Sequence, residues 1–240
     1  MILPALEHFS NLTTLYVPGL RRTLNQLNAA AAVGNILKSL PSLHRLALCG
    51  NELSRCLRTV LEPLVRPLTV LRLNDCNLGN EDWIYLAESR HADTVEELDV
   101  GRNDIRSNQT AFFRFVERLS TSIISLELER VQMNSIQLHQ LSKECSRARR
   151  LHYVDVSDNR SIGHQSILRA LENLCLAPAL EWIVCGLPLN FIATPMEDSR
   201  VDVLARKTSR FRDSLSTRTD IICRKLRRSP VAIVVKRHRG

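Results

Sequence analysis

The sequence predicts an α/β fold built from repeats, and three observations support that prediction. Seven segments follow the pattern Leu-x-x-Leu-x-Leu or an aliphatic variant of it, in successive steps of 31, 25, 27, 28, 28 and 29 residues. Segments with helical spacing of apolar residues lie between them. Hydrophobic residues make up 44% of the chain and aromatic residues only 5%, which fits a leucine-based core. Together these features are typical of a leucine-rich-repeat solenoid (horseshoe) with a parallel concave sheet, outer helices and a C-terminal capping helix and strand. The seven copies begin at Leu12, Leu43, Leu68, Val95, Ile123, Leu151 and Leu180.

Each copy alternates apolar and polar residues over a short stretch, which predicts a strand with one buried face. Cys76, Asn103 and Asn159 follow three of the copies. We expect such a residue to turn the chain and its side chain to satisfy backbone groups of the neighbouring turn. A helix should then return the chain, and Asn80, followed by two acids, resembles a helix start. The helices are predicted at residues 81–90, 111–119, 135–147 and 164–176.

The continuous repeat predicts one solenoid of about seven repeats over residues 1–196, followed by a basic C-terminal cap over residues 197–240. The formal net charge is +8, yet residues 200–240 hold 13 Lys and Arg against 3 acids, while the other residues hold 20 against 22. The bases from Arg206 to Arg228 follow a helical pattern with an apolar stripe, and residues 231–235 predict a final strand. This segment is interpreted first as a cap. The alternative is a binder of nucleic acid or an anionic membrane, with nucleic acid the less favoured partner.

The sequence also favours an intracellular location. No stretch approaches the roughly 20 apolar residues that span a bilayer, and residues 1–8 lack the features of a secretory signal. The seven cysteines are scattered without a Cys-x-x-Cys pair, as expected for reduced thiols. We expect a cytoplasmic protein, with a nuclear location left open.

The repeat register places acidic and aromatic side chains on the predicted concave face. A ladder of like charges costs stability, so five carboxylates on three neighbouring strands suggest a groove for a protein partner with a basic surface or segment. Aromatic side chains next to them would act as anchors. The alternative is a solvated sheet face without a partner. The predicted partner-binding residues are Glu97, Asp99, Glu127, Glu129, Tyr153, Asp155 and Trp182. Replacing Glu127 and Asp155 by Lys is expected to abolish capture without loss of stability.

The sequence predicts neither catalysis nor a cofactor nor a metal site. The histidines show no ligand spacing with the cysteines, and there is no Gly-rich phosphate loop. An open sheet face rarely provides the enclosed pocket that catalysis needs. We therefore expect a protein that is not an enzyme.

Several segments resemble the PRAME / leucine-rich repeat-containing protein 14 family. The segment Pro-Leu-Thr-Val-Leu-Arg-Leu-Asn-Asp-Cys-Asn-Leu from Pro67 resembles it best, with a Pro-Leu that opens a strand, a cysteine at the turn and a helix with an acidic start. The stretch Val-Glu-Glu-Leu-Asp-Val-Gly-Arg-Asn from Val95, the repeat at Tyr153, and the segment Phe-Arg-Asp-Ser-Leu from Phe211 are also similar.

The resemblance implies an intracellular adaptor. Family members are similar to substrate receptors of cullin-2 ubiquitin ligases and to negative regulators of transcription and inflammatory signalling. Their elongin- and cullin-contacting motifs lie in a further N-terminal region, whereas this sequence starts almost inside a repeat. Two hypotheses therefore stay open: a ligase substrate receptor that contacts elongin and cullin-2, and a stand-alone scaffold or inhibitor without a ligase link.

Overall fold

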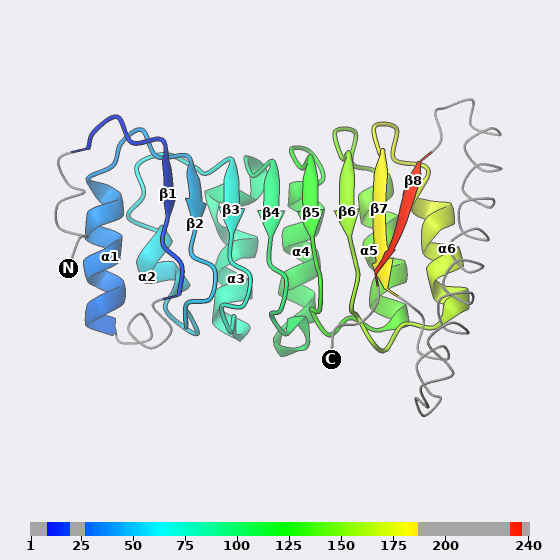
Figure 1. Ribbon diagram of the computed structural model, residues 1–240. Helices are drawn as coiled ribbons and strands as arrows, with labels where there is room; N and C mark the ends of the chain where they lie inside the picture. Colours follow the sequence, from blue (N-terminus) through cyan, green and yellow to red (C-terminus); the bar gives the residue numbers. More distant parts are fainter. Residues whose placement is uncertain (1–8, 20–26, 187–230, 237–240) are drawn as a thin grey trace, which may run out of the picture. The chain divides into compact units, whose positions relative to one another are not determined.

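The computed structural model describes residues 9–19, 27–186 and 231–236 (Figure 1). The chain divides into two compact units, unit 1 (residues 1–123) and unit 2 (residues 124–240). In each unit the strands are parallel and follow the chain order, and helices cover one face of them. This is the α/β leucine-rich-repeat architecture predicted from the sequence.

Unit 1 alternates strands and helices, and its strands pair in register, so that Thr14, Arg45, Val70 and Glu97 occupy one row. Its described elements are β1 (Thr14–Tyr16), α1 (Leu27–Lys38), β2 (Arg45–Ala47), α2 (Leu57–Leu61), β3 (Val70–Arg72), α3 (Asn80–Glu88), the 3-10 helix η2 (Arg90–Asp93), β4 (Glu97–Asp99), the 3-10 helix η3 (Ile105–Ser107) and α4 (Gln109–Leu119).

Unit 2 repeats the same alternation and ends in two longer strands. Trp182–Gly186 pairs in parallel with Ala232–Lys236 over five residues. Its described elements are β5 (Ser125–Glu127), α5 (Ser135–Ser146), β6 (Tyr153–Asp155), α6 (His164–Leu174), β7 (Trp182–Gly186) and β8 (Ala232–Lys236).

All seven predicted repeat strands are confirmed, and each begins two residues after the start of its copy. The four predicted helices and the final strand are also confirmed, with ends that shift by at most two residues. The predicted capping helix lies outside the described residues. The division into a solenoid (1–196) and a cap (197–240) therefore stays a prediction.

The core is made by the central aliphatic residue of each strand. In β2 to β7 the aliphatic side chain at the second position of the strand is at most 1% exposed, because the sheet buries one face against the helices. In unit 1, Trp83 and Phe112 add an edge-to-face ring pair with centroids 5.3 Å apart. The central residues are Leu46, Leu71, Leu98, Leu126, Val154 and Ile183.

Buried asparagines hold successive turns together, as the sequence predicted. The Asn103 side chain accepts hydrogen bonds from the backbone N–H groups of Cys76 and Leu78, both 3.1 Å, and donates to the Leu73 carbonyl at 2.8 Å. In unit 2, Asn159 accepts from the Met133 N–H at 3.0 Å and donates to the Leu128 carbonyl at 2.9 Å. Each amide therefore satisfies backbone groups of the preceding repeat that strand pairing leaves unpaired.

Asp82 links two consecutive helices of unit 1. Its carboxylate accepts from the Gly79 N–H (2.8 Å) at the start of α3. It also accepts from the N–H groups of Arg55 (3.0 Å) and Leu57 (3.2 Å) at the start of α2. The side chain is only 2% exposed, and burial raises its pKa even though these N–H groups favour the charged form. One side chain thus caps its own helix and the helix before it.

Candidate partner-binding face

Two rows of side chains cross β5, β6 and β7 on the face that the helices leave uncovered. Tyr153 pairs in register with Trp182, and Glu127 pairs with Asp155. Neighbouring strands lie about 4.8 Å apart, so the two acids are direct neighbours and so are the two aromatic residues. Glu129 follows β5. We call the surface formed by Glu127, Glu129, Tyr153, Asp155 and Trp182 the unit 2 face.

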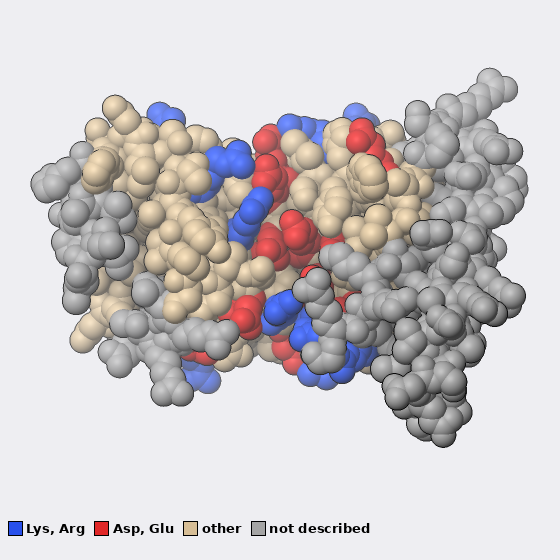
Figure 2. Space-filling view, in the orientation of Figure 1, with Lys and Arg blue, Asp and Glu red and all other residues tan. Residues whose placement is uncertain are grey.

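The members of the unit 2 face differ in exposure. Trp182 is 48% exposed, and Glu127, Glu129 and Tyr153 are half-buried. Red acidic surface is visible over β5 in Figure 2. Trp182 of β7 neighbours Tyr153 of β6, and the half-buried carboxylates lie one strand further along, so this surface is suited to a long partner side chain with both apolar and cationic parts.

Asp155 differs from the solvent-facing position that the sequence predicted. It is 1% exposed, its Oδ1 accepts the Ser157 N–H at 2.8 Å, and its Oδ2 accepts the Tyr153 hydroxyl at 3.5 Å. The turn after β6 folds back onto this carboxylate, and that turn cannot be read from the alternation of residues. A lysine at position 155 would place a cation in a buried site, so we now expect Asp155→Lys to cost stability.

The hydroxyl of Tyr153 marks the place where the negative charges converge. Burial raises the pKa of Tyr153, and the nearby carboxylates of Asp155, Glu127 and Glu129 raise it further. Three acids therefore act on one phenol, and the same field would stabilise a cation placed beside the ring.

The two remaining predicted residues, Glu97 and Asp99, lie in unit 1 on β4. Glu97 forms ion pairs with Arg45 on β2 (3.5 Å) and Arg72 on β3 (3.3 Å). One carboxylate oxygen of Asp99 accepts the Gly101 N–H at 3.0 Å. Figure 2 shows blue and red surface side by side over β3 and β4. The uncovered face of unit 1 is thus of mixed charge, unlike the unbroken acidic ladder predicted from the sequence.

Arg45 and Arg72 are the functional candidates that sequence reasoning left out of the site. Arg45 lies in the same row of the sheet as Glu97, and Arg72 in the same row as Asp99. The repeat register alone was therefore enough to place both arginines on the uncovered face. Tyr16 of β1 is 63% exposed and lies in register with Ala47, which in turn pairs with Arg72.

Comparison with known proteins agrees with the repeat architecture. The chain is 27% identical to leucine-rich repeat-containing protein 14 of Xenopus laevis over 201 residues, which are 81% of this chain. It is 34% identical to the protein of the same name from Mus musculus over 118 residues, 49% of this chain, and 34% identical to that from Homo sapiens over 97 residues, 40% of this chain. The chain is thus similar to the leucine-rich repeat-containing protein 14 of these three species, in agreement with the family resemblance of its sequence. No family model matches it.

The chain spans only part of the length of these relatives. The matched region is 39% of the Xenopus laevis protein, 24% of the Mus musculus protein and 20% of the Homo sapiens protein. The name of these relatives describes a repeat protein and states no reaction. None of the described helices is both long and apolar enough to cross a membrane.

Burial raises the pKa of five cysteine thiols of this chain, which are Cys49, Cys56, Cys76, Cys145 and Cys185. Burial raises the pKa of Cys76, Cys145 and Cys185 to about 12. A thiol with such a pKa is a poor nucleophile and a poor metal ligand at neutral pH. Over residues 9–19, 27–186 and 231–236, no group of three His, Cys, Asp or Glu side chains is placed to hold a metal ion.

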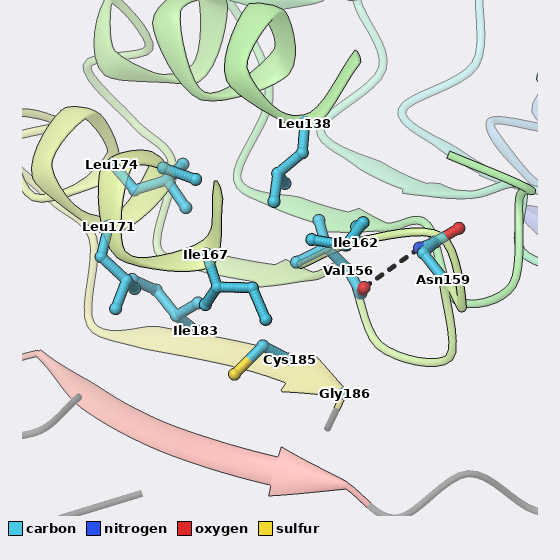
Figure 3. Close-up of a pocket in the computed structure, with 11 residues that line it drawn as sticks. Leu138, Val156, Asn159, Ile162, Ile167, Leu171, Leu174, Ile183, Cys185 and Gly186 are labelled. Carbon is cyan, nitrogen blue, oxygen red and sulfur yellow. Dashed lines mark hydrogen bonds between the residues drawn. The ribbon is translucent and has the colours of Figure 1, made fainter. Parts of the chain in front are cut away.

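A small cavity lies inside unit 2 between α5, α6 and the strands (Figure 3). Its volume is about 20 Å³, and its lining is almost entirely aliphatic, with Leu138, Ile167, Leu171 and Ile183 among its walls. A space of this size holds about one water molecule, and an apolar lining keeps it dry. It is a packing defect of the core and not a substrate pocket.

An open hollow of about 380 Å³ lies on the helix-covered side of unit 1 between α2 and α3. The Arg58 guanidinium lies 5.4 Å from the centre of the Tyr85 ring and 3.8 Å from Glu88. Arg90 donates hydrogen bonds to the carbonyls of Leu64 and Val65, which lie in the loop between α2 and β3. These contacts tie neighbouring repeats of unit 1 to each other.

Proposed function

We propose that this chain is a non-catalytic protein-binding module that holds a basic segment of a partner against the unit 2 face. The observation that carries the proposal is the convergence of three carboxylates on Tyr153, next to the exposed Trp182. A lysine or arginine side chain can lay its alkyl part on the tryptophan and direct its charge to Glu127 and Glu129. The leucine-rich-repeat family is consistent with protein partners.

The finer role that we propose is that of an intracellular adaptor, acting in the cytoplasm and also in the nucleus. It would act as a substrate receptor of a cullin-2 ubiquitin ligase that contacts elongin and cullin-2, or as a negative regulator of signalling or transcription. The support for this role is the family resemblance. The stand-alone scaffold or inhibitor is the competing role, and the unit 2 face would serve both.

The test is affinity purification from cytosolic and nuclear lysates with three baits. The baits are the wild type, Glu127→Lys/Glu129→Lys, and the matched control Glu117→Lys/Glu172→Lys, whose exposed acids lie on helices α4 and α6. We expect a client that the wild type and the control capture and that the face variant loses. Recovery of elongin and cullin-2 by all three baits assigns the receptor role. A client without ligase subunits assigns the scaffold role, and an identical set of captured proteins with all three baits contradicts the proposal.

The basic segment from Arg206 to Arg228, the alternative site for nucleic acid or an anionic membrane, lies outside the described residues. Binding of a polyanion through many phosphate contacts falls steeply with salt. Titration with duplex DNA and with phosphatidylserine vesicles at two salt concentrations therefore separates this alternative from the unit 2 face, which should bind neither.

A further inference from the structure

Positive charge gathers where α5 ends and the chain turns into β6. Residues 143–152 hold four Lys and Arg against one acid, Glu144, which forms an ion pair with Arg147 at 3.0 Å. Blue surface is visible below β6 in Figure 2, at the amino ends of the strands. We call the exposed side chains of Lys143, Arg147, Arg149 and Arg150 the basic patch.

The end of a helix explains only part of this charge. Arg147 is the C-cap of α5, where the helix dipole favours a cation. Arg149 and Arg150 lie beyond the helix, and the effect of the dipole falls off within the last turn. The Arg149 guanidinium has no hydrogen bond or ion pair among the described residues. Helix capping therefore does not account for the basic patch as a whole.

Buried neighbours hold the turn between α5 and β6 in place. Ala148 and Leu151 alternate with the exposed arginines and are buried. The Ala148 N–H donates to the Cys145 carbonyl at 3.0 Å, and the His152 Nδ1 lies 2.7 Å from the Arg150 carbonyl oxygen. An ordered turn thus presents the cations, which lowers the entropic cost of binding a partner.

The equivalent turn between α6 and β7 lies beside the basic patch. The Asn173 side-chain amide of α6 donates to the Ser142 hydroxyl of α5 at 3.0 Å. At the other end of the turns, the Glu181 N–H donates to the His152 carbonyl at 2.9 Å. The two turns are therefore tied together at both ends and run side by side. The exposed residues of the second turn are Leu176, which is 51% exposed, and Pro178.

The two turns together fit an acidic protein segment that carries an aliphatic side chain. Residues 175–180 carry no charge, so aliphatic surface lies next to the cations. Guanidinium groups pair with carboxylates, and an aliphatic side chain would cover the exposed part of Leu176. Neither turn contains a Phe, Tyr or Trp that could stack on a base, and one short turn offers few contacts to a phosphate backbone. The chemistry favours a protein partner over a nucleic acid.

We propose that the basic patch and Leu176 form a second interaction surface of unit 2, which binds an acidic segment of a partner protein. This inference does not rest on the proposed function, because the basic patch is opposite in charge to the unit 2 face and lies in the turns that precede the strands. Unit 2 would then bind a basic segment and an acidic segment on separate surfaces.

The experiment titrates a synthetic peptide, two copies of Asp-Glu-Leu-Asp-Glu-Ser, into full-length proteins by calorimetry. The variant Arg147→Gln/Arg149→Gln is compared with the charge-matched control Arg66→Gln/Arg114→Gln, whose arginines are exposed in unit 1. Leu176→Ser is compared with Ile136→Ser, which replaces an 80% exposed residue at the start of α5. We expect about tenfold weaker binding by Arg147→Gln/Arg149→Gln and about threefold weaker binding by Leu176→Ser. Both controls should bind like the wild type.

Equal affinity of the wild type, Arg147→Gln/Arg149→Gln and its control overturns this inference, and so does absence of binding by the wild type. Tighter binding of duplex DNA or phosphatidylserine vesicles than of the peptide, lost in Arg147→Gln/Arg149→Gln, overturns the choice of an acidic protein segment. Self-association of the wild type that the same variant loses would assign the basic patch to a second copy of the chain and also overturn it. None of these results bears on the unit 2 face, which is tested with a basic ligand. Melting temperatures establish that each variant is folded.

Discussion

His91 makes the stability of unit 1 dependent on pH. His91 lies within η2 and is fully buried, its Nδ1 accepts the Leu68 N–H at 3.1 Å, and its Nε2 has no hydrogen bond among the described residues. Burial, and to a smaller extent the charge of the adjacent Arg90, lower the pKa of His91 from 6.5 to about 4, although the Leu61 backbone acts more weakly in the opposite direction. The imidazole is therefore neutral in the folded protein at neutral pH.

The direction of the effect follows from proton binding. Between pH 6.5 and about 4 the unfolded chain protonates His91 while the folded chain does not, so stability falls as the pH drops through this range. A shift from 6.5 to about 4 corresponds to roughly 3 kcal/mol lost by the lower end of the range. Below pH 4 this residue adds no further loss.

The assay is urea unfolding followed by circular dichroism between pH 7.5 and pH 4, with wild type, His91→Gln and the exposed control His139→Gln. Glutamine keeps an acceptor for the Leu68 N–H but does not titrate. We expect the wild type and His139→Gln to lose roughly 3 kcal/mol more than His91→Gln over this range. Equal pH dependence of all three proteins would refute the assignment of His91 as a buried neutral group.

Two further substitutions test the turns and the face. Asn103→Ala leaves the N–H groups of Cys76 and Leu78 without their acceptor and should lower the free energy of unfolding, measured in urea, by about 2–5 kcal/mol. The exposed control Gln140→Ala should lower it by less than about 0.5 kcal/mol. Equal losses in both variants would contradict the role of the asparagine. Trp182→Ala removes a side chain that is 48% exposed, so it should leave the melting temperature within about 2 °C while weakening the binding of a synthetic basic peptide, an Arg-Gly-Ser repeat that stands in for the partner segment, about tenfold. Unchanged peptide affinity would exclude Trp182 from the binding surface.

The strands could be predicted in full because their signal is local. An aliphatic residue at every second position of a copy fixes which face is buried, and the spacing of the copies fixes the register of neighbours. Asn103 and Asn159 could be assigned for the same reason, since a polar residue at a constant offset from each strand meets the same backbone groups.

The features that could not be predicted depend on contacts between repeats. Asp82 reaches back to the helix of the preceding repeat, and Arg45 and Arg72 approach Glu97 from two other strands. Asp155 is buried, and Ser157 in the turn that follows its strand donates to it. Alternation assigns a side chain to a face of the sheet, but it does not say whether another part of the chain covers that face.

The most direct test of the central claim is a titration of the Arg-Gly-Ser peptide into the wild type, Glu127→Lys/Glu129→Lys and the control Glu117→Lys/Glu172→Lys. Replacing two carboxylates by lysines sets like charges against a basic ligand, which costs several kcal/mol of binding free energy. The account predicts binding by the wild type and the control, and at least about tenfold weaker binding by the face variant at an unchanged melting temperature. Equal affinity of the peptide for all three proteins would contradict the assignment of the unit 2 face as the partner-binding site.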